Sequence, residues 1–142
     1  MQKQKKLNIL GIELSLETKD ETKTILRDTL KGEKQLFLTT PNPEIVLNAN
    51  KDEELHYIIN DSDLAVPDGI GLKFAAMAMG KNISRWSGSD ITTWLLKYAA
   101  EHNYKIAVFN LKGGLSSDDD IRSALQANYP KLKYIVESTD KE

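Results

Sequence analysis

The stretch TTPNPEIVLNA, residues 39–49, follows an apolar run and joins a predicted strand to a predicted helix. Asn42 followed by Pro43 has the form of a helix N-cap and first helical position. A second junction of the same kind, AVPDGIGLKFAAMAMG, spans residues 65–80. In open parallel sheets, loops that follow strands and precede helices lie at the edge where ligands bind. The function of the chain depends on whether these junctions are ordinary turns or two sides of one site.

Outward from these junctions, strands and helices alternate along the chain. Short apolar runs predict five strands, in residues 7–14, 34–40, 63–67, 105–111 and 131–138. Helical spacing and capping signals predict helices in residues 21–31, 43–51, 53–61, 71–80, 90–103 and 118–130. Thr18 with Glu21 has the form of a capping box, and Ser89 is the expected cap of the helix that follows it.

This alternation predicts the α/β class, with a parallel sheet whose two faces are covered by helices. Right-handed crossovers would give it a Rossmann-like, doubly wound topology. At 142 residues the whole chain, residues 1–142, is expected to form a single domain.

Composition excludes several classes of function. The net charge of -2 gives no reason to expect nucleic acid as a partner, and the absence of cysteine removes disulfides, thiolate zinc sites and thiol nucleophiles. The start of the chain lacks the apolar run of a signal peptide, and no stretch reaches the roughly 18 apolar residues of a spanning helix. We therefore expect a cytoplasmic protein, with peripheral contact at the inner face of the cell membrane and homo-oligomer formation left open.

Asp68 is the most interesting polar residue of the two junctions. Pro67 fixes the entry to its turn, while Gly69 and Gly71 permit unusual backbone angles and close approach of a ligand. A carboxylate at this place can act as a general base. The alternative from the residues alone is a plain turn in which Asp68 caps the next helix.

The other candidates have alternatives of the same kind. Thr40 and Asn42 can contact a ligand, or can be a strand-end residue and a helix cap. Gly113 and Gly114 can admit a phosphate to the next helix or simply form a turn, and Arg85 can bind a diphosphate or be a surface or ion-paired arginine. Neither a dinucleotide fingerprint nor a P-loop is present, which disfavours a nucleotide-dependent oxidoreductase.

The motifs taken together resemble the WecG/TagA/CpsF glycosyltransferase family. Its pattern is Thr-x-Asn-x-Glu, then Pro-Asp-Gly-x-Gly, then Arg-x-x-Gly-x-Asp, in that order. The matching positions are Thr40, Asn42 and Glu44, then Pro67, Asp68, Gly69 and Gly71, then Arg85, Gly88 and Asp90. The resemblance extends from about Leu7 to the last predicted strand.

The resemblance implies an inverting transfer of N-acetylmannosamine, or a related sugar, from a UDP-sugar donor to a polyprenyl-diphosphate-linked sugar acceptor. Asp68 would be the general base, with Thr40 and Asn42 orienting the substrate from the facing loop. Arg85 would contact a diphosphate, and the turn at Gly113 and Gly114 would lie near the donor phosphates. The family implies no dedicated metal, so no cofactor is expected. Its members serve teichoic acid, enterobacterial common antigen or exopolysaccharide synthesis.

The sequence also departs from the family. Family members continue beyond the position of Glu142, so the resemblance implies that the C-terminal part of the family is missing here. The acidic run SSDDD, residues 116–120, also places carboxylates where donor phosphates would bind, and like charges weaken such binding. A second hypothesis is therefore a non-catalytic binding or assembly module derived from the family.

Overall fold

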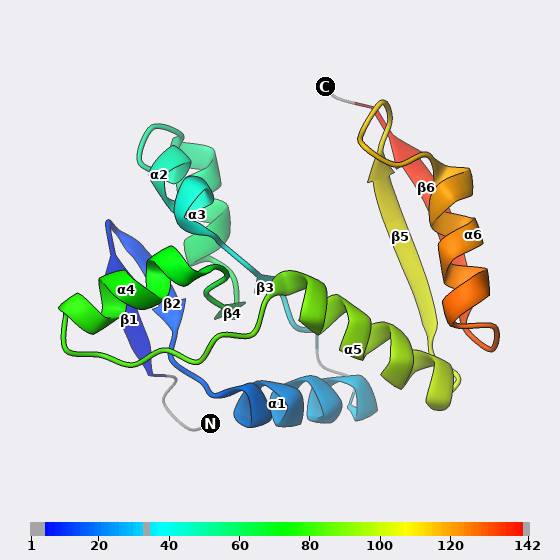
Figure 1. Ribbon diagram of the computed structural model, residues 1–142, viewed down its shortest axis with the longest axis horizontal. Helices are drawn as coiled ribbons and strands as arrows, with labels where there is room; N and C mark the ends of the chain where they lie inside the picture. Colours follow the sequence, from blue (N-terminus) through cyan, green and yellow to red (C-terminus); the bar gives the residue numbers. More distant parts are fainter. Residues whose placement is uncertain (1–4, 33–34, 141–142) are drawn as a thin grey trace. The chain divides into compact units, whose positions relative to one another are not determined.

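The computed structural model describes residues 5–32 and 35–140 (Figure 1). Its elements follow in the order β1 (Lys6–Ile9), β2 (Ile12–Ser15), α1 (Lys19–Lys31), β3 (Leu38–Thr39), α2 (Pro43–Ala49), α3 (Glu53–Asn60), β4 (Leu64–Ala65), α4 (Ile70–Ala78), α5 (Gly88–Glu101), β5 (Lys105–Leu111), α6 (Asp118–Asn128) and β6 (Lys133–Thr139). This mixture of helices with parallel strand pairs confirms the α/β class. The chain divides into two compact units, residues 1–88 and 89–142. The single-domain organisation stays a prediction.

The first unit begins with a β-hairpin, and the prediction of one strand over residues 7–14 is wrong. β1 and β2 pair antiparallel, with Leu7 opposite Leu14 and Ile9 opposite Ile12. Leu10 and Gly11 form the turn, with φ angles of 52° and 85°. Positive φ at both central residues is the geometry that two-residue hairpins favour. The apolar run hides this turn because Leu10 is an unusual turn residue.

The next two strands form the parallel pair that positions the candidate site. β3 and β4 are shorter than the runs that predict them, and they pair with Leu38 opposite Leu64 and Thr39 opposite Ala65. Lys34, which begins the first of these runs, lies outside the described residues. α2 and α3 supply the crossover, in agreement with the rule that parallel strands require a long connection.

The hydrophobic core of the first unit joins the hairpin to the helices. It contains Leu7, Ile9, Ile12, Leu14, Val46, Ala49, Ile59, Ala65, Leu72, Ala76 and Ile83. β1 and β2 thus contribute alternate residues, while α2, α3 and α4 each contribute one apolar face. The backbone amide of Ala65 also donates a 3.1 Å hydrogen bond to Ser15 Oγ, which ties β4 to β2.

The predicted capping signals are confirmed in two helices, α1 and α2. Thr18 and Glu21 form the predicted capping box of α1, and Asn42 caps α2 with Pro43 in its first turn. Ser117 and Asp120 form a second capping box at α6. The prediction for Ser89 is wrong, because α5 already begins at Gly88.

The second unit is built on the parallel pair β5–β6, in the register Ile106 opposite Tyr134 and Val108 opposite Val136. These side chains pack with residues of α5 and α6 in one hydrophobic cluster. Phe109 and Ile135 point to the other face and are largely exposed. Within this unit, both helices therefore contact the same face of the strand pair.

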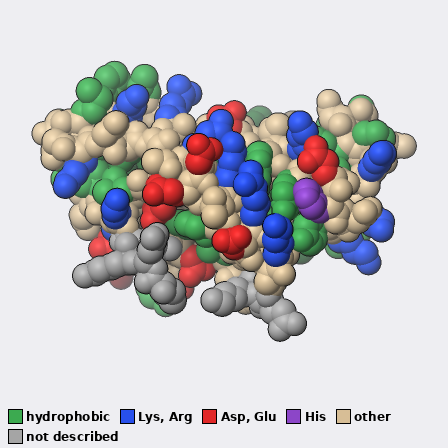
Figure 2. All heavy atoms as spheres, turned by 90° about the horizontal axis from the view of Figure 1, so that it is seen from below, with side chains coloured by type: hydrophobic (Ala, Val, Ile, Leu, Met, Phe, Trp, Pro, Cys, Tyr) green, Lys and Arg blue, Asp and Glu red, His purple; other side chains and the backbone are tan. Residues whose placement is uncertain are grey.

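The face of the molecule drawn in Figure 2 is mixed in charge. Lys and Arg side chains lie among Asp and Glu side chains on the face shown in Figure 2, with hydrophobic side chains between them. This distribution agrees with the small net charge of -2. Over residues 5–32 and 35–140, no helix has the length and apolar character needed to cross a membrane.

Candidate active site

The strand-to-helix junctions at residues 39–49 and 65–80 lie side by side in the first unit. Beyond the short β3–β4 ladder, the amide of Val66 donates a 2.8 Å hydrogen bond to the carbonyl of Thr39. The amide of Asp68 then donates a 2.9 Å bond to the carbonyl of Pro41. Parallel pairing thus continues from the strands into both loops. The loops that carry Thr40 and Asp68 are held together by their backbones.

The carboxylate of Asp68 accepts a hydrogen bond from the first residue of α5. Its Oδ2 lies 3.0 Å from the backbone nitrogen of Gly88, and the side chain is partly buried. A carboxylate is favourable at a helix N-terminus, where amide groups have no partner within the helix. The bond fixes the orientation of a group that the sequence leaves as either a base or a cap.

The alternative that Asp68 caps the next helix is wrong. α4 has Gly69 as its N-cap residue, and this cap makes no side-chain hydrogen bond. The Asp68 carboxylate instead bonds to Gly88, which is twenty residues further along the chain. Its place is therefore set by a contact distant in sequence and not by local turn chemistry.

Gly88 also brings Thr40 to the same place. A Cβ atom added to Gly88 would lie 2.7 Å from Thr40 Oγ1 and 3.4 Å from Asp68 Oδ2. The hydroxyl of Thr40 and the carboxylate of Asp68 therefore flank one small residue. Three separate stretches of the sequence meet here: the loop after β3, the loop after β4 and the start of α5.

Glycines allow the two loops to approach closely. Gly69 has φ +88°, which L side chains rarely adopt, and an added Cβ would lie 3.3 Å from Pro43 Cδ. At Gly71 an added Cβ would lie 2.8 Å from Pro43 Cγ, inside van der Waals contact. Pro43, the first residue of α2, thus packs against the start of α4 at a distance that only glycine permits.

The side-chain oxygen of Asn42 makes a structural hydrogen bond within its own helix. Asn42 Oδ1 accepts a 2.8 Å hydrogen bond from the amide of Ile45, which makes it the N-cap of α2. The structural alternative for Asn42 is therefore confirmed. Its contact with a substrate stays a prediction.

Arg85 lies in the segment between α4 and α5, where two buried residues flank it. Ile83 and Trp86 are almost fully buried, whereas Arg85 is exposed. The Trp86 ring is approached by Lys19 Nζ and Lys23 Nζ, each 5.8 Å from its centroid. The buried neighbours anchor the backbone on both sides of Arg85 and leave its guanidinium in solvent.

Gly113 and Gly114 belong to the second unit, at the carboxyl end of β5. Gly113 has φ +76°, and the Gly114 amide donates a 2.9 Å hydrogen bond to the carbonyl of Leu111. The two glycines therefore form a tight turn, as one of the two alternatives predicts. Their proximity to a donor phosphate stays a prediction.

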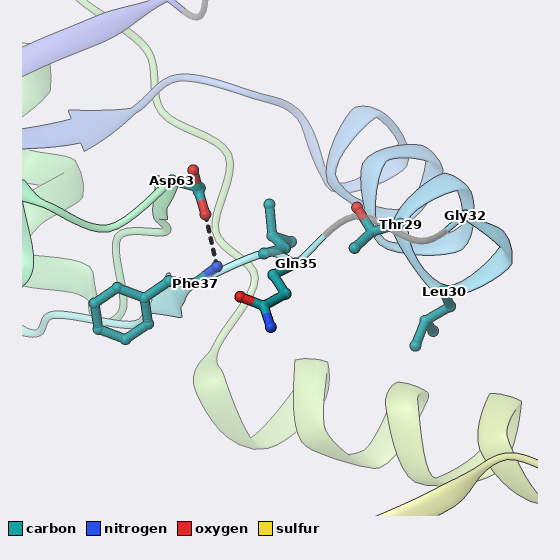
Figure 3. Close-up of a pocket in the computed structure, with 7 residues that line it drawn as sticks. Thr29, Leu30, Gly32, Gln35, Phe37 and Asp63 are labelled. Atoms are coloured by element: carbon teal, nitrogen blue, oxygen red, sulfur yellow. Dashed lines mark hydrogen bonds between the residues drawn. The ribbon is translucent and has the colours of Figure 1, made fainter.

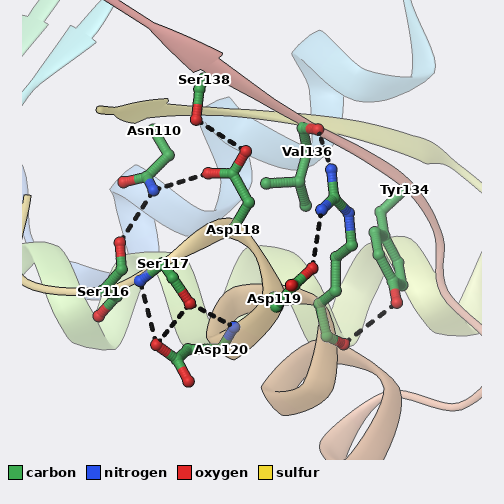
Figure 4. A network of polar contacts seen from close by, with 10 residues as sticks. Asn110, Ser116, Ser117, Asp118, Asp119, Asp120, Tyr134, Val136 and Ser138 are labelled. Atoms are coloured by element: carbon green, nitrogen blue, oxygen red, sulfur yellow. Dashed lines mark hydrogen bonds and ion pairs between the residues drawn. The ribbon is translucent and has the colours of Figure 1, made fainter. Parts of the chain in front are cut away.

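A network of carboxylates lies beside this turn (Figure 4). Asp118 accepts a 2.8 Å bond from Asn110 Nδ2 and a 2.7 Å bond from Ser138 Oγ. These two hydrogen bonds lower the pKa of Asp118, the bond from Asn110 having the larger effect. Hydrogen bonds from the side chain and backbone of Ser117 lower the pKa of Asp120. Both groups therefore carry negative charge at neutral pH, where a phosphate would be repelled.

The first unit also has a surface pocket (Figure 3). Its lining consists of Thr29, Leu30, Gly32, Gln35, Leu36, Phe37 and Asp63. Asp63 Oδ2 accepts a 2.7 Å hydrogen bond from the amide of Phe37, which occupies that carboxylate with a structural contact. None of the predicted site residues lines this pocket.

Sequence reasoning assigned no role to Gly88, although the residue is part of the Arg-x-x-Gly-x-Asp motif. The structure makes it the donor to Asp68 and the neighbour of Thr40. The spacing of the motif was the available signal. A glycine followed by a helical pattern suggests a helix start whose amide can bind a carboxylate.

Comparison with known proteins agrees with this arrangement. The sequence matches the Glycosyl transferase WecG/TagA/CpsF family over residues 7–140. Similar proteins include N-acetylglucosaminyldiphosphoundecaprenol N-acetyl-beta-D-mannosaminyltransferases of three bacteria. The Bacillus spizizenii protein is 32% identical over 54% of this chain and 30% of its own length. The Bacillus subtilis protein is 28% identical over 68% of this chain and 37% of its own length.

The protein of Staphylococcus aureus strain MRSA252 is 28% identical over 91% of this chain. That alignment covers 51% of the relative, so the chain spans about half the length of the curated relatives that it matches. The family match covers nearly the whole sequence and includes all three motifs that meet around Gly88. The chain therefore belongs to the Glycosyl transferase WecG/TagA/CpsF family.

Proposed function

We propose that this chain carries the catalytic portion of an inverting glycosyltransferase. It moves N-acetylmannosamine, or a related sugar, from UDP to a polyprenyl-diphosphate-linked sugar in the synthesis of teichoic acid or another cell-surface polysaccharide. The observation that carries the proposal is the position of Asp68, whose carboxylate is held by the Gly88 amide beside the Thr40 hydroxyl. The names of the relatives, which specify an N-acetylmannosaminyl group as the group transferred and an N-acetylglucosaminyldiphosphoundecaprenol acceptor, support it.

In the proposed reaction, Asp68 is the general base. Its carboxylate takes the proton from the acceptor hydroxyl as the hydroxyl oxygen forms a bond to the anomeric carbon of the donor sugar. The bond from that carbon to the UDP oxygen breaks, and UDP leaves with the electron pair. Attack on the face opposite UDP inverts the configuration. The Gly88 hydrogen bond uses Oδ2 and keeps the carboxylate in one orientation while the proton moves.

The remaining candidates take binding roles. Thr40 and Asn42 orient the sugar from the facing loop, while Gly69 allows the backbone of the Asp68 loop to adopt its positive φ. Arg85, exposed between two buried anchors, contacts a diphosphate, for which its planar guanidinium is suited. Gly113 and Gly114 are assigned to the surroundings of the donor phosphates. The lipid-linked acceptor places the protein at the membrane surface during turnover.

The experiment that tests the proposal replaces the base without changing its size. We expect Asp68→Asn to lower transfer from UDP-N-acetylmannosamine to a lipid-linked N-acetylglucosamine by at least about a thousandfold, within the range of general-base effects. Binding of the UDP-sugar should change little. The matched control is Asp61→Asn, an exposed aspartate at the end of α3, which should transfer as the wild type does. Wild-type turnover by Asp68→Asn would exclude Asp68 as the base.

A non-catalytic binding or assembly module is the second candidate. One observation favours it: the first turn of α6 carries carboxylates near the turn at Gly113 and Gly114, and like charges there would oppose the donor phosphates. Calorimetry of this chain with UDP-N-acetylmannosamine separates the candidates. Saturable binding supports the transferase, whereas the absence of heat at millimolar donor supports the module.

A further inference from the structure

We propose that the outer face of α4 binds an anionic membrane surface. The outer face is defined here as Ile70, Phe74 and Met77. The inference rests on the proposed function, because a lipid-linked acceptor supplies the reason for the protein to meet a bilayer. It adds the surface that makes the contact and the chemistry that recognises it.

α4 is apolar on both sides. Its inner face carries Leu72 and Ala76, which are buried in the core of the first unit. The outer face follows the spacing i, i+4, i+7, and its three side chains are 56%, 60% and 55% exposed. A surface helix of a soluble domain normally presents polar side chains on its outer side. Three large apolar side chains in one row therefore indicate an apolar partner.

The charged residues of the sequence segment that contains this face have one sign. From Gly69 to Ser89 the sequence contains no Asp or Glu, and its charged residues are Lys73, Lys81 and Arg85. Lys73 lies three residues after Ile70 and four before Met77, so it borders the outer face. Lys81 and Arg85 are exposed in the segment that follows the helix. A chain with net charge -2 thus contains a segment of 21 residues whose charged side chains are all basic.

An apolar row bordered by lysines fits an anionic bilayer. Interfacial helices bury apolar side chains at the level of the headgroups, and basic residues beside them are attracted to anionic lipid. A second copy of the chain fits less well. In a twofold contact through α4, each Lys73 would lie close to its own counterpart, and like charges would oppose each other.

The position of α4 connects this surface to the proposed chemistry. Ile70 is two residues after Asp68, and α4 begins directly at the loop that holds the carboxylate. Contact of the outer face with headgroups would bring Asp68 to the level of a lipid-linked diphosphate. The acceptor would then reach the base without leaving the membrane.

The test is binding to vesicles made of phosphatidylcholine alone or of an equimolar mixture with phosphatidylglycerol. The wild type should bind the mixed vesicles and not the neutral ones. The triple variant Ile70→Ser, Phe74→Ser, Met77→Ser should bind at least about tenfold more weakly, with circular dichroism checking its fold. The matched control is Leu47→Ser with Tyr57→Ser, which removes similarly exposed apolar side chains from α2 and α3 and should stay within about twofold of wild type.

A second pair of variants tests the charge. Lys73→Gln with Lys81→Gln should lose the preference for mixed vesicles, and added salt should do the same to the wild type. The proposal would be overturned if the wild-type protein did not bind the mixed vesicles. It would also be overturned if the control variant Leu47→Ser, Tyr57→Ser bound them as weakly as the triple variant. If the wild-type protein is a dimer that does not bind vesicles and the triple variant is a monomer, the outer face of α4 binds a second copy of the chain instead.

The same assay separates this inference from the proposed function. Asp68→Asn should lose transfer and still sediment with mixed vesicles as the wild type does. If Asp68→Asn still catalyses transfer while the triple variant no longer binds vesicles, Asp68 is not the general base and the outer face of α4 is the membrane-binding surface. If Asp68→Asn loses transfer while the wild-type protein does not bind vesicles, the outer face of α4 is not a membrane-binding surface and Asp68 remains the general base.

Discussion

The backbone amide of Asp68 donates a 2.9 Å hydrogen bond to the carbonyl of Pro41, which places the two candidate loops in parallel register. Thr40 immediately precedes Pro41, so the same bond fixes the spacing between the candidate base and the facing hydroxyl. The Gly88 amide then bonds to the Asp68 carboxylate from a third stretch of chain. Substitutions at these contacts separate the structural from the chemical part of the site.

Gly88→Ala should disturb the contact between Thr40 and Asp68. The new Cβ would lie 2.7 Å from Thr40 Oγ1, so the side chains must move apart. We expect a loss of about 1–3 kcal/mol in the free energy of unfolding, as in other overpacked sites. Transfer should fall at least about tenfold because the Asp68 carboxylate shifts. Urea denaturation and initial rates measure the two effects.

The double variant Thr40→Ala, Gly88→Ala provides the control. Removing Oγ1 gives the new methyl group room, so most of the lost stability should return. Transfer should stay low if the Thr40 hydroxyl orients the substrate. Full recovery of both quantities would show that Thr40 acts only by its volume.

Gly71→Ala tests the contact between α2 and α4. Alanine at an uncrowded helical position would stabilise by about 0.5–1 kcal/mol relative to glycine. At Gly71 the added Cβ would lie 2.8 Å from Pro43 Cγ, so we expect a net loss of about 1–2 kcal/mol instead. Thermal denaturation shows whether Gly71→Ala stabilises or destabilises the protein. Pro43→Ala in the same chain should reverse the effect, and a stabilising single variant would contradict the packing described here.

Two variants of Asn42 distinguish its role as a helix cap from a role in substrate binding. Asn42→Ala should cost about 1 kcal/mol of stability, the usual value for a lost N-cap, whereas Asn42→Asp should keep the cap. Transfer should fall in both variants if the side-chain amide contacts the substrate. Urea denaturation and transfer rates provide the measurements.

Asp52→Ala is the matched control for this experiment, because Asp52 caps α3 with a 3.0 Å bond to the Leu55 amide. It should lose similar stability and keep its transfer rate. If Asn42→Asp also transfers at the wild-type rate, Asn42 is a helix cap alone.

The second unit should lose stability in acid. The folded state lowers the pKa of Asp118 and Asp120 through hydrogen bonds to Asn110, Ser138 and Ser117. A lowered folded pKa means that the stabilisation is complete above the ordinary aspartate pKa and is lost as the pH falls through the folded pKa below it. Circular dichroism melts from pH 7 to pH 2.5 should show the decline. Asp120→Asn should flatten part of that decline.

Asp119→Asn is the control in the same helix turn. The Asp119 carboxylate is exposed and pairs with Arg122 at 3.2 Å, an ion pair of the kind that contributes little. Its variant should follow the acid profile of the wild type. An Asp120→Asn profile identical to wild type would mean that the Ser117–Asp120 capping box does not contribute to the acid response.

The sequence by itself determined the features that depend on short-range bonds. The caps at Thr18 and Asn42, the parallel crossovers and the α/β class all follow from residues three or four positions apart and from alternating hydrophobic patterns. The family motifs likewise named Asp68 before any contact was known. The hairpin escaped prediction because Leu10 and Gly11 interrupt an apolar run without a typical turn pair.

Only the tertiary structure decided what the Asp68 carboxylate does and which face of α4 is exposed. Gly88 donates to Asp68 across twenty residues, and Gly71 meets Pro43 across a comparable distance in sequence. No local propensity encodes such contacts, because they depend on the path of the chain between the two partners. The apolar pattern of α4 is compatible with burial of either side of the helix. Because Leu72 and Ala76 pack into the core, the outer face of Ile70, Phe74 and Met77 is left exposed.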